Sequence, residues 1–198
     1  PYIVEGFSKE WNGIIPVEML AEGERRVPTL MLRHNQVNRV ADEMIPSFAP
    51  NMKQALLIGQ GAGHMVSTLE HHGISTDTVE IDPAIDEAAR DHFDFIPTGR
   101  TLIGDARYEI RKLKGPYDLI ILDVFTGGSE PVHLLTHETI EQIKTLLTSH
   151  GLLALNFVAF FENGQNPALA SVAKTLAQSF AHQLAFISEP NNDFNDFI

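Results

Sequence analysis

The chain has 198 residues, of which 43% are hydrophobic and 20% are charged, so it is long enough and apolar enough to bury one substantial core. Its formal net charge of -12 argues against a surface that binds nucleic acid or anionic lipid, because both would repel it. The absence of cysteine excludes disulfides, thiolate catalysis and cysteine-bound metals. We find neither a signal-peptide pattern nor an apolar run of membrane length, and we therefore expect a cytoplasmic protein without membrane contact.

The first part of the chain, residues 1–50, is predicted to form a small N-terminal β-hairpin layer followed by a helix. Two β-like runs, residues 14–20 and 28–33, are separated by a polar, turn-like stretch. Apolar residues then recur at helical spacing over residues 37–48. The sequence starts without a methionine and stops within residues 194–198, which resemble the start of a strand. We therefore expect part of a longer polypeptide, truncated near its C-terminal strand.

Residues 51–198 alternate short apolar runs with amphipathic stretches. Strands are predicted over residues 55–58, 77–81, 101–104, 117–123, 151–156 and 183–187, and helices over residues 65–71, 83–92, 106–112, 137–147 and 167–182. Asp82 and Thr136 are suited to cap the helices that follow them, and Pro83 is suited to a first helical position. This alternation predicts an α/β fold, a doubly wound and mainly parallel Rossmann-like sheet with helices on both faces. Ligands of such sheets bind outside the carboxyl ends of the strands.

A glycine-rich turn, residues 59–63, follows the first strand. Glycine accepts a positive φ and lets a ligand approach the backbone closely. Glu80 closes the second strand at roughly 20 residues past the first glycine, the spacing at which an acidic side chain reaches a ribose hydroxyl. The alternative is a strand-end acid that only caps the next helix, but Asp82 already suits that role. The cofactor-binding residues predicted here are Gly59, Gln60, Gly61, Gly63, Glu80 and Ile81.

Asp105 and Asp123 follow the third and fourth strands. Asp105 is placed to accept from the exocyclic amine of an adenine while the amide of Ala106 donates to a ring nitrogen, and the alternative is a helix cap. Asp123 ends a buried strand, where partial desolvation suits a carboxylate that orients or deprotonates an amine. The alternative for Asp123 is an acid that binds loop amides.

The segment after Asp123 is polar, contains glycine and is suited to close over a site. Thr126 lies in this loop and His133 follows it, so we assign both to the substrate side, with His133 as a proton carrier. We predict no metal site, because the histidines lack an HExxH pattern or a third ligand at metal spacing.

Five stretches together resemble one family: residues 57–63, 79–83, 103–107, 117–123 and 131–136. The family is the polyamine aminopropyltransferases, spermidine synthase and its relatives, on the class I S-adenosylmethionine-dependent methyltransferase fold. The resemblance implies Glu80 on the ribose, Asp105 on the adenine and Asp123 as the acid that orients and deprotonates the attacking amine. It further implies S-adenosylmethionine or its decarboxylated form as co-substrate, a small-molecule amine or other nucleophile as acceptor, and a homodimer.

Two positions depart from the family pattern. The family's glycine turn typically carries an aspartate, which holds the aminopropyl ammonium, where this chain has Ala62. A second aspartate usually stands where this chain has Thr126. Each lost charged hydrogen bond to a polyamine costs about 1.5–3 kcal/mol. Both changes point away from an efficient aminopropyltransferase and suit divergent chemistry such as methyl transfer. The family resemblance itself predicts a spermidine synthase-like transferase that passes an aminopropyl group to an amine. The alternatives are a methyltransferase of unknown acceptor and a non-catalytic module that binds S-adenosylmethionine.

Overall fold

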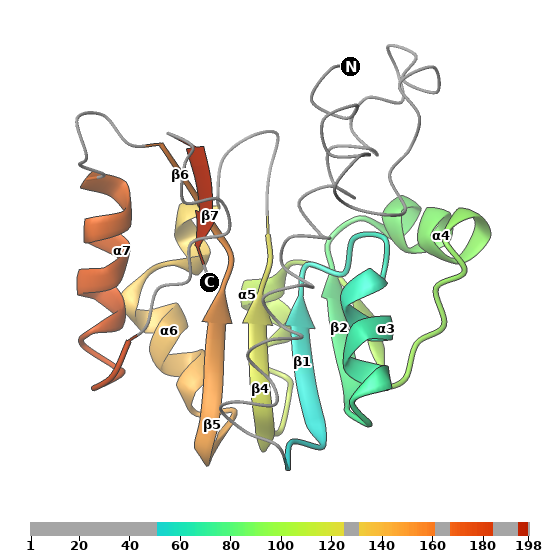
Figure 1. The fold of residues 1–198 in the computed structure, drawn as a ribbon, viewed down its shortest axis with the longest axis horizontal. Helices are drawn as coiled ribbons and strands as arrows, with labels where there is room; N and C mark the ends of the chain where they lie inside the picture. The colour runs from blue at the N-terminus through green and yellow to red at the C-terminus, as the bar shows by residue number, and fades with distance from the viewer. Residues whose placement is uncertain (1–50, 125–130, 161–166, 184–193, 198) are drawn as a thin grey trace.

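The structure, a computed structural model, describes residues 51–124, 131–160, 167–183 and 194–197 of the chain. Its centre is a five-stranded parallel sheet in the order β3-β2-β1-β4-β5 (Figure 1). The strands are β1 Gln54–Ile58, β2 Ser75–Glu80, β3 Thr101–Ile103, β4 Tyr117–Leu122 and β5 Leu147–Leu155. The chain enters at β1, runs out to β3 on one side and then to β5 on the other. The order therefore reverses beside β1, where sheets of this type bind their ligands.

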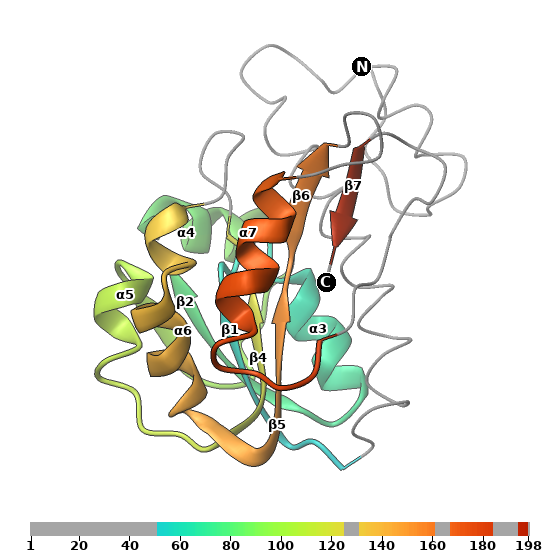
Figure 2. The same cartoon turned by 90° about the vertical axis from the view of Figure 1, so that its left-hand side faces the viewer.

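Helices cover both faces of the sheet, as the alternation of elements predicts (Figure 2). They are α3 His64–His71, α4 Pro83–His92, α5 Ala106–Glu109, α6 His137–Lys144 and α7 Pro167–Leu176, with a 3-10 turn η2 at Val132–Leu134. On one face Leu57 packs in a cluster with Met65 of α3. On the other face Ile58 packs with Ile140 and Ile143 of α6. Successive residues of β1 thus point into two separate cores, which is why the strand is apolar from Ala55 to Ile58.

Two of the helix starts confirm the capping predictions. The carboxylate of Asp82 accepts a hydrogen bond of 2.9 Å from the amide of Ala84, with Pro83 at the first helical position of α4. The hydroxyl of Thr136 accepts from the amide of Thr139 at 3.3 Å. A side-chain acceptor at this position satisfies a donor that the helix itself leaves unpaired.

The ends of three predicted helices are wrong. The helix predicted over residues 106–112 ends at Glu109, and the helix predicted over residues 167–182, α7, ends at Leu176. After α7, the backbone amides of residues 178 and 179 donate to the carbonyl oxygens three residues earlier, as in a 3-10 turn. The helix expected to run to residue 147 ends at Lys144, because Leu147 already pairs with Tyr117 as the first residue of β5.

A strand forms near the end of the chain, where the sequence predicts the start of one, but several other predictions fall on residues that the structure does not describe. Phe194–Phe197 forms β7, which pairs antiparallel with β6, Phe157–Phe160, in a separate two-stranded sheet. The N-terminal layer predicted over residues 1–50, the loop residue Thr126 and nearly all of the strand predicted over residues 183–187 lie outside the described residues.

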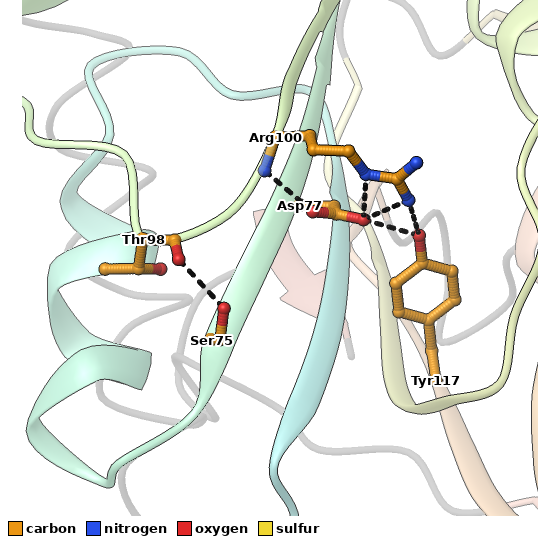
Figure 3. Close-up of polar contacts among 5 residues, drawn as sticks. All are labelled: Ser75, Asp77, Thr98, Arg100 and Tyr117. Carbon is orange, nitrogen blue, oxygen red and sulfur yellow. Dashed lines mark hydrogen bonds and ion pairs between the residues drawn. The ribbon is translucent and has the colours of Figure 1, made fainter.

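A polar cluster joins β2 to β4 across the amino-terminal half of the sheet, with Asp77 and Tyr117 buried and the side chain of Arg100 62% exposed (Figure 3). Asp77 accepts hydrogen bonds from the backbone amide of Arg100 at 2.7 Å, from its guanidinium at 2.6 Å and from the Tyr117 hydroxyl at 2.7 Å. Burial raises the pKa of Asp77, but these hydrogen bonds outweigh it, so the pKa lies below its ordinary value. Burial and the bond to Asp77 raise the pKa of Tyr117 to about 12. We refer to Asp77, Arg100 and Tyr117 as the clasp.

Candidate functional site

The predicted site residues meet at one edge of the sheet because the backbone pairing continues one residue past each strand. The backbone amide of Gly59 donates to the carbonyl of Val79 at 2.9 Å, and the backbone amide of Asp123 donates to the carbonyl of Ile58 at 2.8 Å. On either side of these, the backbone amide of Gly104 donates to the carbonyl of Glu80 at 2.8 Å, and the backbone amide of Asn156 donates to the carbonyl of Leu122 at 3.0 Å. These rungs align the residues that follow β3, β1, β4 and β5 in one row with the end of β2.

The glycine turn has two positions that only glycine fits. Gly59 has a φ of 95°, and a Cβ there would overlap the carbonyl oxygen of Asp123 and lie 2.7 Å from its carbonyl carbon. Gly63, at the start of α3, has a φ of 82°, and a Cβ there would lie 2.6 Å from Cγ of Phe95. The turn therefore passes directly against the backbone of Asp123, which ties the predicted cofactor turn to the predicted catalytic acid.

Glu80 is held against the glycine turn. The residue is 7% exposed, and its two carboxylate oxygens accept from the amides of Gly61 at 3.2 Å and Asp82 at 3.1 Å. The bond to Asp82 shows that Glu80 also braces the start of α4. The bond to Gly61 fixes a carboxylate beside the turn, and a carboxylate oxygen accepts more than one hydrogen bond.

The side chain of Gln60 points into the fold. It is fully buried, its amide group donates to Asp86 at 2.9 Å, and its carbonyl oxygen accepts from the hydroxyl of Thr78 at 2.9 Å. The sequence alone assigns Gln60 to the cofactor, but both ends of its side chain serve to join the turn to β2 and α4. A contact of Gln60 with a cofactor would therefore come from its backbone.

Asp105 and His133 lie close together. Asp105 accepts from the amide of Tyr108 at 3.3 Å, so it does cap α5, and its other oxygen lies 3.9 Å from Nε2 of His133. Both side chains are about half exposed, at 49% and 47%. Beside them, Ile81 after β2 and Val132 of η2 are exposed at 63% and 77%. Large apolar side chains in the open next to polar strand ends are suited to the faces of a flat ring.

Asn156, which the sequence reasoning missed, is the direct partner of Asp123. Its amide group donates to Oδ1 of Asp123 at 2.9 Å, and its own Oδ1 is buried with no hydrogen-bond partner. An unpaired buried acceptor costs about 1–3 kcal/mol. One signal was available, since Asn156 is a polar residue directly after an apolar strand, as Asp123 is. The bond itself joins residues 33 positions apart and leaves no local trace.

Two features are absent from the residues that the structure describes. Within them, no group of three or more histidine, aspartate or glutamate side chains is arranged to hold a metal ion. In the same part of the chain, no helix is both long enough and apolar enough to cross a membrane.

Comparison with protein-family profiles finds no match. Among curated proteins, the chain is 41% identical over 108 residues to an N-terminal histidine N-methyltransferase of Emericella nidulans and 41% identical over 119 residues to a polyamine aminopropyltransferase of Vibrio vulnificus. The matches cover 52% and 55% of this chain but only 19% and 39% of those proteins, so the chain spans less than half the length of either relative.

Solved structures share the fold. Human methyltransferase-like protein 13 in complex with SAH superposes with a TM-score of 0.62 at 19% identity, covering 83% of this chain and 79% of that one. A probable spermidine synthase from Corynebacterium glutamicum gives a TM-score of 0.67 at 21% identity, covering 81% of this chain and 60% of that one. The chain is therefore similar in sequence both to a polyamine aminopropyltransferase and to an N-terminal histidine N-methyltransferase, and it has the fold of the S-adenosylmethionine-dependent methyltransferases and spermidine synthases.

Proposed function

We propose that this chain binds S-adenosylmethionine at the carboxyl edge of the sheet and transfers an alkyl group from it to an amine. The observation that carries the proposal is the row of strand ends. It sets Glu80 and Asp123 on opposite sides of one glycine turn: the carboxylate of Glu80 bonds to the turn, and the backbone carbonyl of Asp123 lies directly against it.

The residues present fit such a nucleoside. Glu80 is a carboxylate held beside the turn, suited to the ribose hydroxyls, while the turn offers backbone without side chains that would obstruct a ligand. Asp105 and the amide of Ala106 are the predicted partners of the adenine edge. The exposed Ile81 supplies an apolar surface for the ring.

Asp123 is the proposed base. The bound ammonium of the acceptor gives one proton to this carboxylate, which exposes the nitrogen lone pair. Nitrogen then bonds to the carbon attached to sulfur, the carbon–sulfur bond breaks, and its electron pair remains on sulfur as a thioether. Asp123 later returns its proton to solvent. Since the sulfonium is already a good leaving group, the protein contributes mainly alignment and proton removal.

The group transferred is proposed to be methyl. Ala62 is 5% exposed and offers no charge to hold an aminopropyl ammonium, and the same substitution removes repulsion against the carboxylate of intact S-adenosylmethionine. Aminopropyl transfer remains the second candidate, because the relative from Vibrio vulnificus carries that name at the same 41% identity as the methyltransferase from Emericella nidulans.

Isothermal titration with S-adenosylmethionine and with its decarboxylated form tests this assignment. We expect the intact form to bind more tightly, because Ala62 neither repels its carboxylate nor holds the aminopropyl ammonium of the decarboxylated form; one hydrogen bond gained by that carboxylate, about 1.4 kcal/mol, corresponds to about tenfold. Ala62→Asp should narrow or reverse that preference, whereas the neutral control Ala62→Ser should not. Tighter binding of the decarboxylated form to the unaltered protein would overturn methyl transfer, and no binding of either would overturn the proposed function.

A further inference from the structure

The pair formed by Asp123 and Asn156 contains more hydrogen-bonding capacity than the fold uses. Asn156 is 1% exposed, and its amide group donates to Asp123 at 2.9 Å. Its carbonyl oxygen, next to the proposed base, is buried without a partner. Buried polar atoms in native proteins are nearly always paired, and an exception points to a ligand, a water molecule or a catalytic role.

The orientation of the Asn156 side chain is fixed by its neighbour. Turning the amide around would set its oxygen against the carboxylate of Asp123, so two acceptors would face each other and the amide group would lose its partner. As long as Asp123 is ionised, the donor end of Asn156 faces it and the oxygen stays unpaired. The pair thus holds two kinds of acceptor side by side, a carboxylate and a buried amide oxygen.

We propose that the carbonyl oxygen of Asn156 accepts a second N–H of the attacking nitrogen, so that the site selects a primary amine and transfers one group to it. This rests on the proposed function, because Asp123 must be the base that takes the first proton. Asn156 is then a specificity-determining residue at the acceptor nitrogen.

The count of hydrogens explains the selectivity. A primary ammonium has three N–H hydrogens and gives one of them, as a proton, to Asp123. The two N–H groups that remain donate to the Asp123 side chain and to the carbonyl oxygen of Asn156. The nitrogen lone pair attacks the carbon attached to sulfur. The carbon–sulfur electron pair leaves with sulfur. The product, once it has lost a further proton to solvent, is a secondary amine. In a second round, the neutral nitrogen of that product has only one hydrogen, which leaves one acceptor unpaired. Transfer therefore stops after one group.

Binding of two probe amines tests this without knowledge of the natural acceptor. The full protein is saturated with S-adenosylhomocysteine and titrated with butylamine, which has three N–H groups as an ammonium, and with N,N-dimethylbutylamine, which has one. We expect butylamine to bind about tenfold more tightly, the value of one hydrogen bond. Asn156→Leu, of similar size, should abolish this preference.

Thr76→Val is the matched control. Thr76 is also fully buried in the sheet with an unpaired side-chain oxygen, but it lies in the amino-terminal half of β2. Thr76→Val should keep the preference for butylamine. If the preference came only from the bulk of the two methyl groups of N,N-dimethylbutylamine, it would also persist in Asn156→Leu.

Equal binding of the two amines to the unaltered protein, binding of neither, or an unchanged preference in Asn156→Leu would each overturn the inference. The comparison in the unaltered protein stands even if a variant fails to fold. Failure of S-adenosylhomocysteine itself to bind would instead overturn the proposed function, and the inference with it.

Discussion

Replacing Gly59 by alanine should disrupt both the sheet and the site. The residue has a φ of 95°, so any side chain brings backbone strain of about 1–3 kcal/mol. The new Cβ would also overlap the carbonyl oxygen of Asp123 and lie 3.0 Å from Cγ1 of Val124. The Cβ meets backbone atoms of Asp123, which are held by the pairing of the strand ends, so the clash can be relieved only if β1 and β4 separate. Overpacking of this kind costs about 1–3 kcal/mol more. We expect a total loss of about 2–6 kcal/mol in the free energy of unfolding.

Gly73 provides the matched control for this substitution. Its φ of 72° also lies in the left-handed region, but a Cβ there meets nothing within 4 Å. Gly73→Ala should therefore cost only the backbone term, about 1–3 kcal/mol. Urea unfolding followed by circular dichroism measures both free energies, and calorimetric titration with S-adenosylmethionine should show weakened binding for Gly59→Ala only. If Gly59→Ala costs no more than Gly73→Ala and binds equally well, the close approach of turn and acid is refuted.

Three further predictions concern the clasp, the buried glutamine and the ribose acid. Asp77→Asn should lower the free energy of unfolding by about 1.5–3 kcal/mol at neutral pH. The pKa of Asp77 is lowered in the fold, so this stabilisation should be fully present at pH values above the ordinary pKa of 3.8 and be lost as the pH falls through the folded pKa. The free energies of unfolding of the unaltered protein and of Asp77→Asn should therefore converge in acid. A difference between them that stays constant with pH would contradict the prediction. Gln60→Leu should cost about 2–4 kcal/mol through two lost buried hydrogen bonds, measured by urea unfolding, and a cost below about 1 kcal/mol would show that they do not hold the turn. Glu80→Gln should weaken S-adenosylmethionine binding by about 10–100-fold in calorimetry, and unchanged affinity would remove Glu80 from the ribose.

The order of the elements and several of their starts could be predicted because their causes are local. Short apolar runs indicated β1, β3, β4 and the second half of β5, and the caps Asp82 and Thr136 act on amides two or three residues away. The ends of the helices were less predictable. The last helical residue of α6 depends on the pairing of Leu147 with Tyr117, a contact 30 residues distant in the chain that no local propensity encodes.

The site was predictable in position but not in its supporting contacts. The rule that ligands bind at the carboxyl ends of parallel strands selected Glu80, Asp105 and Asp123, and the strand-end rungs bring them into one row. Gln60 looked like a ligand residue because it stands between glycines, yet its partners are Thr78 and Asp86. Such side-chain bonds depend on the assembled fold, so a motif identifies the loop but not the direction of each side chain.

A crystal structure of the full protein with S-adenosylhomocysteine tests the central claim most directly. We predict that the ribose hydroxyls bond to Glu80, that the adenine edge faces Asp105 and the amide of Ala106, and that the sulfur lies on the side of Asp123 and Asn156. A nucleoside bound elsewhere on the molecule, or bound at this edge without contact to Glu80, would contradict the account.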